Sequence, residues 1–476
     1  MNRTLSGPRA ATLLGDFPTS PAYRGLADGL RRLIADGRIP VSTRLPSERD
    51  LTAALGVSRT TVTRAYQLLR ELGYASARQG SRTVAALPVA RGHRGDHLLT
   101  PAGGGDDDLD LTCAASVAPA GMSAAFEAAV AELPSYLGGN GYFPSGLPAL
   151  REALAARFAA RGLPTSPSQI IVTAGALGGL AIAARAVTAT GDRVLVESPT
   201  YPNAIATLQH AGCRIAGVDV DVHGWDIDSM AAALRQVAPR AVYLIPDFHH
   251  PTGALLPAEQ RAELGAALRA SRTAALIDES MVDVPLEEQT MPPPLGCFVP
   301  DSITIGSASK SFWGGLRIGW LRVPDSRSST MIAARLSLDL GAPVLEQLVL
   351  LQLLASENEI MGWRRAQLRA SRDALMAALQ AELPSWTVTP PRGGLAIWAE
   401  LSEPVSSTLT SVAERHGLLL ASGPSFAPEG GLERHLRLPY TLPPASLVQA
   451  VRRLRLAWDE TLTNGTAHPG RRTLVA

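Results

Sequence analysis

Lysine is almost absent from this sequence. Of the 44 lysine and arginine residues among 476, 43 are arginine and one, Lys310, is lysine, whereas a typical chain of this length has roughly two dozen lysines. Arginine can replace lysine as a surface cation, but it cannot form an imine, because that reaction needs a primary amine with an accessible neutral form. Lys310 is therefore a candidate for covalent chemistry, and chance survival of one lysine is the alternative.

Cysteine and long apolar runs are also scarce. Cys113, Cys213 and Cys297 form an odd set without Cys-x-x-Cys spacing, which argues against a disulfide framework and against a zinc site. We interpret them as ordinary thiols of a cytoplasmic protein without a bound metal. The N-terminus lacks the basic-then-apolar pattern of a signal peptide, and no apolar run reaches the length of a membrane span, so we expect no membrane partner.

Charge is nearly balanced over the whole chain but not along it. The net charge is only +1. Residues 1–84, however, contain 13 arginines against 6 acidic residues, which leaves about six negative charges in excess elsewhere. We therefore expect a basic module attached to an acidic body, and 476 residues are enough for two or three domains.

Residues 21–84 carry the pattern of three helices followed by two short strands. Ser47 and Ser58 are expected N-caps, and Gly56 and Gly73 are expected to end two helices. The expected elements are helices over residues 21–38, 47–55 and 58–72 and a two-stranded wing over residues 74–84. This order predicts a winged helix-turn-helix domain at 21–84, preceded by an N-terminal arm at 1–20 and followed by a Pro-, Gly- and Asp-rich linker at 85–110.

The rest of the chain alternates short apolar strands with helices. The expected strands cover residues 170–173, 193–197, 241–246, 273–278 and 302–306. This alternation predicts an α/β domain at 111–466 with a mostly parallel sheet covered on both faces, and a tail at 467–476. Ligands of such domains bind at the carboxyl ends of the strands, where the residues discussed below fall.

The segment from Leu45 to Leu51, with the sequence Leu-Pro-Ser-Glu-Arg-Asp-Leu, and its continuation to Thr83 closely resemble the GntR-type winged helix. A helix that opens with Ser, Arg and Thr side chains suits phosphates and base edges. By resemblance, the DNA-contacting positions are Arg49, Arg59, Thr60, Thr61, Thr63, Arg64 and Gly80. The alternative is a three-helix bundle with a solvated basic face, but motif, capping and charge together favour double-stranded DNA as the partner.

The surroundings of Lys310 resemble the cofactor site of fold-type I pyridoxal-phosphate enzymes. Ser307-Ala308-Ser309-Lys310 is followed, after a glycine-rich turn, by Arg317. The resemblance implies an aminotransferase-like domain that holds pyridoxal 5′-phosphate as an imine on Lys310, with the phosphate on Ser307 and Arg317. The turn Ala174-Gly175-Ala176 after a strand adds backbone N–H groups for the same phosphate, although such a turn is a weak signal alone.

Four more residues match positions of this site. By resemblance, Tyr201 stacks on the pyridine ring and Asp278 faces the ring nitrogen, where a carboxylate keeps the ring an electron sink. Tyr142 matches the tyrosine that reaches the phosphate of the neighbouring protomer, which implies a homodimer, and Arg437 matches the arginine that binds the substrate carboxylate. Taken alone, Asp278 could instead be a strand-end residue that caps a loop.

Two positions depart from working aminotransferases. His250 stands where they have an asparagine before Pro-Thr-Gly, and Met281 stands where they commonly have a tyrosine three residues after the aspartate. Both family residues bond the ring oxygen of the cofactor. A histidine can still donate from an imidazole N–H, whereas methionine cannot donate. We expect His250 to contact the ring oxygen, with an ordinary buried histidine as the alternative, and we expect turnover to be weakened while imine formation survives.

The order of winged helix, linker and aminotransferase-like domain resembles the MocR-type subfamily of GntR regulators. The resemblance implies a transcription regulator that senses pyridoxal phosphate, or an amine or amino-acid effector, through imine chemistry at Lys310. One alternative is an active aminotransferase with an accessory DNA-binding module; within the favoured interpretation residual half-transamination is still possible. Another alternative is a DNA-binding protein whose large domain is an inert scaffold, but the one retained lysine argues against it.

Overall fold

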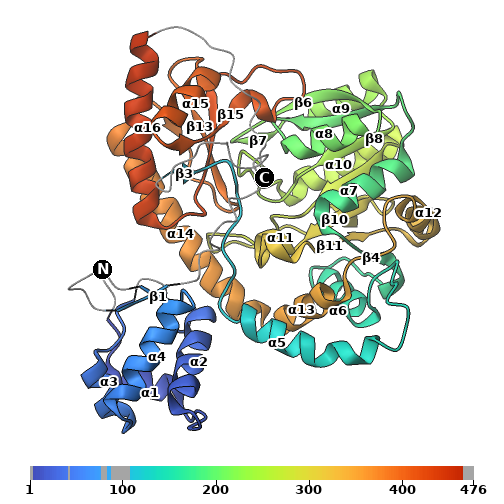
Figure 1. Ribbon diagram of the computed structural model, residues 1–476. Coiled ribbons are helices and arrows are strands. Elements are labelled where there is room, and N and C mark those ends of the chain that lie inside the picture. The colour runs from blue at the N-terminus through green and yellow to red at the C-terminus, as the bar shows by residue number, and fades with distance from the viewer. Residues whose placement is uncertain (1–3, 41–42, 77–82, 87–107, 465–476) are drawn as a thin grey trace. The chain divides into compact units, whose positions relative to one another are not determined.

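The computed structural model describes residues 4–40, 43–76, 83–86 and 108–464, and these fall into two compact units. The first unit comprises residues 1–94 together with 118–131, and the second comprises residues 95–117 together with 132–476. The second unit therefore contains a short stretch of chain whose two neighbours in sequence both belong to the first unit. Figure 1 labels the elements of each unit.

The first unit is built on a small helical core. Its elements are α1 (Gly7–Leu14), α2 (Ala22–Ala35), α3 (Glu48–Leu55), α4 (Arg59–Glu71), and the strands β1 (Ala75–Ser76) and β2 (Val84–Ala85). Helix α2 packs against α4, and α1 packs against α3. Leu26 and Leu30 of α2 and Val62 and Leu69 of α4 are fully buried between them. The antiparallel pair β1–β2 confirms the base of the expected wing.

Side-chain caps fix the ends of these helices. The hydroxyls of Ser47 and Ser58 each accept a hydrogen bond, at 3.1 Å, from a backbone N–H three residues later, and Gly56 ends α3 with a φ of 64°. These three features confirm the capping pattern expected from the sequence. The residues interpreted as an N-terminal arm include a helix, α1, which Ser6 caps and whose Ala10 is fully buried. The expected arm therefore contains a helix that packs into the core of the first unit, and the sequence of so short a segment did not indicate this contact. Helix α5 (Met122–Glu132), 36 residues beyond β2, also groups almost entirely with the first unit.

The second unit contains an eight-stranded sheet in the order β4-β11-β10-β9-β8-β5-β6-β7. Its strands are β4 (Ile170–Thr173), β5 (Arg193–Ser198), β6 (Arg214–Asp221), β7 (Gly224–Trp225), β8 (Ala241–Leu244), β9 (Ala274–Asp278), β10 (Ile303–Ser307) and β11 (Gly319–Arg322). Strands β11 and β7 pair antiparallel with their neighbours, and the other pairings are parallel. The prediction of a mostly parallel sheet is confirmed.

Helices cover both faces of this sheet, as the apolar strands require (Figure 1). Val194 and Val196 of β5 belong to one buried cluster, whereas Leu195 between them belongs to another, because successive side chains of a strand point to opposite faces. The first cluster is completed by α7 (Gly175–Val187), α8 (Pro202–His210) and α12 (Asp325–Leu336). The second is completed by α9 (Ile227–Val237) and α10 (Ala258–Ser271).

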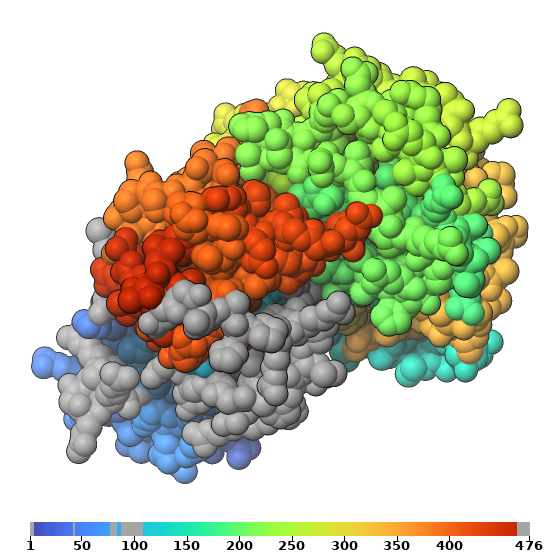
Figure 2. Space-filling model, turned by 90° about the horizontal axis from the view of Figure 1, so that it is seen from above, coloured from blue at the N-terminus to red at the C-terminus, as the bar shows by residue number. Residues whose placement is uncertain are grey.

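A smaller antiparallel sheet, in the order β12-β13-β16-β15, forms a separate layer of the second unit. Its strands are β12 (Thr387–Val388), β13 (Ala396–Glu400), β15 (Ala421–Ser422) and β16 (His435–Pro439). It shares an apolar core with α14 (Glu357–Glu382), α15 (Ser406–Arg415) and α16 (Pro444–Asn464). In Figure 2 this layer, in orange and red, lies against the green layer of the large sheet.

The remaining elements connect these layers. They are η1 (Leu133–Tyr136), α6 (Pro148–Ala160), η2 (Pro167–Gln169), η3 (Leu295–Cys297), α11 (Ala308–Ser311), η4 (Gly314–Leu316), α13 (Val344–Ala355) and η5 (Gly423–Phe426). Leu109–Asp110 form a strand, β3, that pairs in parallel with β14 (Leu418–Leu419). The linker expected to end at residue 110 therefore joins the folded domain at least two residues earlier.

Candidate functional site

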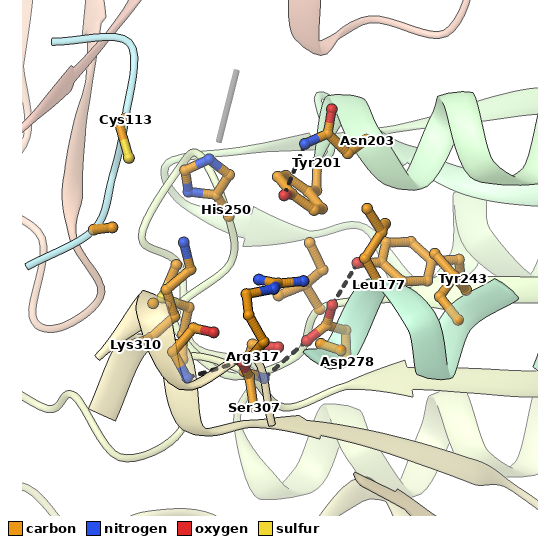
Figure 3. A pocket seen from close by; sticks show the side chains of 18 residues that line it. Cys113, Leu177, Tyr201, Asn203, Tyr243, His250, Asp278, Ser307, Lys310 and Arg317 are labelled. Carbon is orange, nitrogen blue, oxygen red and sulfur yellow. Dashed lines mark hydrogen bonds between the residues drawn. The ribbon is translucent and has the colours of Figure 1, made fainter. Parts of the chain in front are cut away.

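A cavity of about 360 Å³ opens at the carboxyl ends of the parallel strands of the large sheet. The residues that line it and that the sequence singled out are Ala176, Tyr201, His250, Asp278, Met281, Ser307, Lys310 and Arg317. Figure 3 shows several of these side chains directed toward one space from different strands and loops. Other lining residues, among them Cys113, Asn203 and Tyr243, were not expected to take part.

Lys310 stands on the short helix α11, directly after β10. Its Nζ donates to the backbone carbonyl of Ala114 at 3.0 Å. Burial lowers the pKa of Lys310; Cys113 and Asp278 oppose this shift, while Arg437 and Arg317 reinforce it. A lowered pKa increases the fraction of neutral amine, which is the form that attacks an aldehyde.

An anion-binding corner lies beside Lys310, at the N-terminus of α7. Gly175 has a φ of +80°, and a Cβ there would lie 2.8 Å from Nη2 of Arg317, so glycine allows the guanidinium to approach the helix start closely. Arg317 itself has a φ of 53°, which is strained for a residue with a side chain. Free N–H groups and a guanidinium in one corner suit a phosphate dianion.

Two further residues shape this corner. Gly319 of β11 permits the close approach of the strand to α7, because a Cβ there would lie 2.5 Å from the backbone nitrogen of Ala176. Ser307 ends β10, and its hydroxyl accepts a hydrogen bond from the N–H of Ser309 at 3.1 Å. The hydroxyl hydrogen of Ser307 thus remains free to bond a ligand oxygen.

Asp278 is held rigidly at the end of β9. One carboxylate oxygen accepts the hydroxyl of Tyr243 at 2.6 Å, and the other accepts the N–H of Ser280 at 2.8 Å. Burial raises the pKa of Asp278, whereas hydrogen bonds from Ser280 and Tyr243 and the charge of Lys310 lower it. Tyr243 was missed from the sequence; the available signal was a single phenol in the otherwise aliphatic strand β8, next to β9.

Tyr201 and His250 form one wall of the cavity, with ring centroids 6.1 Å apart and planes inclined by 76°. The Tyr201 hydroxyl accepts a hydrogen bond from Asn203 at 2.9 Å. Burial holds the pKa of His250 well below its ordinary value, with contributions from the charges of Arg437, Lys310 and His249. The imidazole is therefore neutral near pH 7 and has one N–H to donate, whereas Met281 adds only an apolar surface.

Arg437 of β16 is fully buried close to the cavity. Its Nη2 donates to the carbonyl of Thr112, and its Nε and Nη1 have no hydrogen-bond partner among the described residues. Burial lowers the pKa of Arg437 to about 10, against the raising effects of Cys113, Asp110 and Tyr201. Two unpartnered buried donors on a cation are chemically suited to an anionic ligand.

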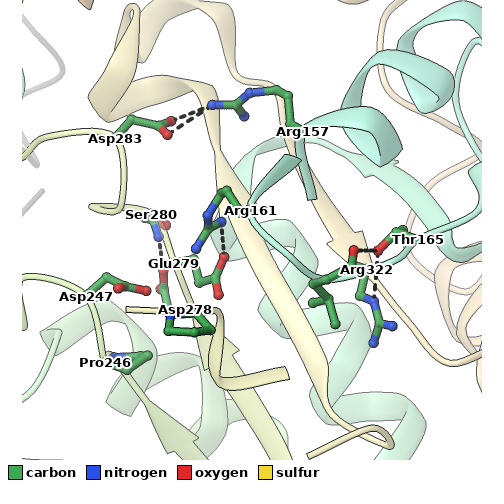
Figure 4. A network of polar contacts seen from close by, with 12 residues as sticks. Arg157, Arg161, Thr165, Pro246, Asp247, Asp278, Glu279, Ser280, Asp283 and Arg322 are labelled. Carbon is green, nitrogen blue, oxygen red and sulfur yellow. Dashed lines mark hydrogen bonds and ion pairs between the residues drawn. The ribbon is translucent and has the colours of Figure 1, made fainter. Parts of the chain in front are cut away.

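A network of ion pairs fixes the segments that follow Asp278 to neighbouring helices (Figure 4). Arg161 contacts Glu279, the residue after Asp278, at 2.5 Å. Arg157 bridges Asp283 and Glu357 at 3.0 and 2.5 Å, and Asp283 also accepts the hydroxyl of Ser311, at the end of α11, at 2.8 Å. The elements that carry Asp278 and Lys310 are therefore fixed to α6 and α14.

Tyr142 does not line the cavity of its own chain. Its side chain is 60% exposed, and its backbone N–H donates to Asn140 at 3.0 Å. No residue group of the described part of the chain has the His, Cys, Asp and Glu arrangement of a metal site.

The first unit presents the residues expected to contact DNA. Arg49, Arg59 and Thr60 are exposed, and Glu48 accepts the hydroxyl of Thr63 at 2.8 Å and contacts Nε of Arg59 at 3.6 Å. The Thr61 hydroxyl lies 2.9 Å from that of Ser58, and the Arg64 guanidinium stacks on the Tyr23 ring at 4.7 Å. Arg64 is thus held against α2, while Gly80 lies outside the described residues.

Two family models match the chain. Residues 122–454 match the aminotransferase class I and II family, and residues 22–84 match the bacterial regulatory proteins of the gntR family. Between them these matches account for both units. In the described part of the chain no helix has both the length and the hydropathy that crossing a bilayer requires.

Curated relatives share the whole arrangement. The chain is 30% identical to the HTH-type pyridoxine biosynthesis transcriptional regulator PdxR of Corynebacterium glutamicum over 407 residues, covering 82% of this chain and 85% of that protein. It is 27% identical to the HTH-type transcriptional regulator TauR of Rhodobacter capsulatus over 485 residues, covering 93% of this chain and 98% of that protein.

A solved structure resembles the second unit. It is the α-aminoadipate aminotransferase LysN of Thermus thermophilus, complexed with N-(5′-phosphopyridoxyl)-L-leucine. The two sequences are 27% identical, and the superposition has a TM-score of 0.69 and covers 75% of this chain and 94% of LysN. The cofactor of this family is pyridoxal 5′-phosphate, which the amine, anion corner and buried carboxylate of the cavity fit. The chain belongs to the aminotransferase class I and II family and, through its GntR domain, to the MocR-type transcription regulators.

Proposed function

We propose that this regulator changes its affinity for operator DNA when pyridoxal phosphate, and then an amine or amino acid, occupies the Lys310 cavity. The observation that carries the proposal is the position of the only lysine of the chain. Lys310 lies close to both an anion-binding corner and Arg437, a buried arginine with two unpartnered donors among the described residues. This arrangement suits a cofactor with an aldehyde and a phosphate, together with a ligand that carries a carboxylate.

Each side chain of the cavity has a role in this proposal. When bound, the cofactor supplies an aldehyde that forms an imine with a primary amine and a ring that withdraws electrons. Arg317, Ser307 and the N–H groups of Ala174, Gly175 and Ala176 hold its phosphate. Tyr201 lies against the ring, Asp278 faces the ring nitrogen, and His250 donates its single N–H to the ring oxygen. Arg437 binds the ligand carboxylate.

Slow turnover would fit the same cavity, since Asp278 and Arg437 are both in place. Met281, however, cannot donate to the ring oxygen. Of the two phenols that line the cavity, Tyr243 donates to Asp278 at 2.6 Å, and Tyr201 accepts from Asn203 at 2.9 Å and is assigned to the ring face. We therefore propose sensing as the main activity. A steady-state assay for keto-acid release against a panel of amino acids separates the two: sustained multiple turnovers would favour the enzyme.

The proposed assembly is a homodimer in which Tyr142 of each chain completes the partner's phosphate site. The exposed position of Tyr142, away from the cavity of its own chain, supports this. A dimer presents two DNA-binding units, so the operator should contain repeated or inverted half-sites. Light scattering tests the assembly, and a cofactor-loaded monomer at micromolar concentration would contradict it.

The direct test of sensing uses DNA sequences selected by the full-length protein from a random library. The affinity for the selected sequence is compared for the cofactor-free protein, the pyridoxal-phosphate form, and that form with each amine of a panel. Sensing predicts that at least two of these states differ in affinity, footprint or DNA bending. If all three agree in every respect, the large domain is only a dimerisation scaffold.

A further inference from the structure

A short stretch of backbone accepts hydrogen bonds from two cations, Lys310 of the cavity and Arg437 close to it. We name residues 110–117 the covering segment. Its Thr112 carbonyl accepts from Nη2 of Arg437, and its Ala114 carbonyl accepts from Nζ of Lys310 at 3.0 Å. The two carbonyls are two residues apart in a stretch without helix or strand, and between them Cys113 lines the cavity. One piece of chain therefore contacts the two groups to which the proposed function assigns the ligand.

The covering segment is anchored at its start by a strand and a turn. The N–H groups of Leu109 and Leu111 each donate, at 2.9 Å, to backbone carbonyls beside β14. The Asp110 carboxylate accepts from the Thr112 N–H at 2.7 Å and from the Thr112 hydroxyl at 2.6 Å. This turn redirects the chain after β3, so Asp110 positions the Thr112 carbonyl on Arg437.

The other end of the covering segment is tied to the helix that carries Lys310. Arg364 is fully buried, and its Nη2 donates to the carbonyl of Val117 at 2.7 Å and to the carbonyl of Phe312 at 2.8 Å. Phe312 directly follows α11. A shift of either α11 or the covering segment therefore also affects the other, because both are bonded to Arg364.

A carboxylate competes with this arrangement at Arg437. An arginine binds a carboxylate through two nitrogens, either Nε with Nη2 or Nη1 with Nη2, so Nη2 takes part in both modes. That nitrogen is the one that the Thr112 carbonyl occupies, whereas Nε and Nη1 have no partner among the described residues. A charged carboxylate is the stronger acceptor, so a two-nitrogen contact displaces the neutral carbonyl.

The contact at Lys310 weakens for a separate reason. An ammonium has three hydrogens to donate, but a nitrogen bonded to an aldehyde carbon keeps at most one. The hydrogen bond to Ala114 is therefore reduced when Lys310 holds the cofactor. A ligand amine that displaces Lys310 from the cofactor returns hydrogens to the lysine nitrogen, so the contact that a ligand carboxylate removes is the one at Arg437, and an amine without a carboxylate leaves that contact in place.

We propose that the Thr112 and Ala114 carbonyls take the place of a ligand in the resting site, and that a carboxylate-bearing ligand releases the covering segment. The inference rests on the proposed function, because it uses the same cavity. It also gives the effect a route, since in sequence the segment is followed directly by Ala118, which belongs to the first unit. The effector class that fits is an amino acid, not a simple amine.

Hydrogen exchange measured by mass spectrometry on the full-length protein tests this inference. The probes are N-(5′-phosphopyridoxyl)-L-leucine and its counterpart without the carboxylate, N-(5′-phosphopyridoxyl)-3-methylbutylamine. Loss of a hydrogen bond to a charged group predicts that the leucine adduct raises exchange in the peptide over residues 109–117 roughly tenfold or more. The amine adduct should raise it much less, and a peptide within β13 should not respond.

Three outcomes overturn the inference. They are unchanged or slower exchange with the leucine adduct bound, an equal response to both adducts, and failure of both adducts to bind, which would also overturn the proposed function. If operator affinity responds to ligand while exchange does not, the proposed function stands and the covering segment is not its route. Asp110→Asn provides an independent check, because loosening the turn should raise exchange over residues 109–117 without any ligand.

Discussion

Arg59 of the DNA-binding unit and Arg437 of the cavity use the same side chain in opposite surroundings. The Arg59 side chain is 79% exposed and lies 3.6 Å from Glu48, so water and a nearby acid both stabilise its charge. Arg437 is fully buried, and burial lowers its pKa to about 10. An exposed cation can exchange partners at little cost, whereas a buried one keeps its charge only beside a suitable acceptor.

This difference is consistent with the role proposed for the one lysine of a chain with 43 arginines. On the exposed face of α4 any cation can bind phosphate, and arginine does so with two nitrogens. In the cavity, the proposed imine formation needs an amine that can lose its proton, and burial favours this at Lys310 by lowering its pKa. The composition of the sequence thus marks the one position at which arginine cannot serve.

The largest expected effect comes from replacing Lys310. Lys310→Arg keeps the cation but cannot form an imine, so covalent capture of pyridoxal phosphate should be abolished; Lys310→Ala should give the same result. Borohydride reduction followed by peptide mapping checks this, and the single lysine makes the assignment unambiguous. Trapping on any other residue would contradict the role of Lys310.

Capture of the cofactor should also depend steeply on pH. Below the lowered pKa of Lys310, the neutral fraction and hence the rate of capture should rise about tenfold per pH unit. The rate should level off at a pH below 10.5, the ordinary pKa of a lysine. Stopped-flow absorbance of the cofactor-free protein measures the profile, and a rate that still rises at pH 10.5 would show that burial does not activate the amine.

The anion corner is tested by Gly175→Ala. A Cβ would lie 2.8 Å from Arg317 at a φ of +80°, so the guanidinium and the start of α7 must separate, and cofactor affinity should fall about tenfold. Gly178→Ala in the same helix is the matched control, because its Cβ would meet its nearest neighbour at 3.9 Å. Equal cofactor affinities of the two variants would show that the corner does not bind the phosphate.

On the exposed side of the comparison, Arg59→Ala should weaken operator binding by about 1–3 kcal/mol if a base contact is lost, or lower the salt slope by about one if a phosphate contact is lost. Arg70→Ala, at the other end of α4, is the control and should have little effect. Fluorescence anisotropy over a range of salt concentrations measures both variants. If Arg70→Ala weakens operator binding as much as Arg59→Ala, the loss of affinity comes from the reduced positive charge of the unit and not from a specific contact of Arg59.

The smallest effect is expected at Glu48, which accepts Thr63 at 2.8 Å and contacts Arg59 at 3.6 Å. Glu48→Gln removes a negative charge beside the DNA-binding cations, so affinity for non-operator DNA should rise about twofold to threefold. A titration with DNA of unrelated sequence checks this. Weaker non-operator binding would mean that Glu48 acts mainly by holding Arg59 in position.

Local patterns in the sequence predicted those parts of the fold that local interactions decide. Ser47 and Ser58 cap the expected helices, and the apolar runs at 170–173 and 193–197 form strands, because a cap or a strand face is decided by a few adjacent residues. The resemblance to fold-type I pyridoxal-phosphate enzymes also implied that Lys310, Asp278 and Arg317 share one site, and they line one cavity.

Contacts between distant segments were not predictable in this way. Tyr243 reaches Asp278 across two neighbouring strands, and Arg437 reaches the carbonyl of Thr112, 325 residues away. The ion pair between Arg161 and Glu279 spans 118 residues. None of these partners shares a local pattern with the residue it contacts, and each pairing can be inferred only when the order of the strands in the sheet is known.

The central claim, that the Lys310 cavity controls the DNA-binding unit, is tested most directly by one titration. Operator affinity is measured with and without pyridoxal phosphate for the unmodified protein and for Lys310→Arg. We predict that the cofactor shifts the affinity of the unmodified protein and leaves that of Lys310→Arg unchanged. The same shift in both proteins, or no shift in either, would contradict the claim.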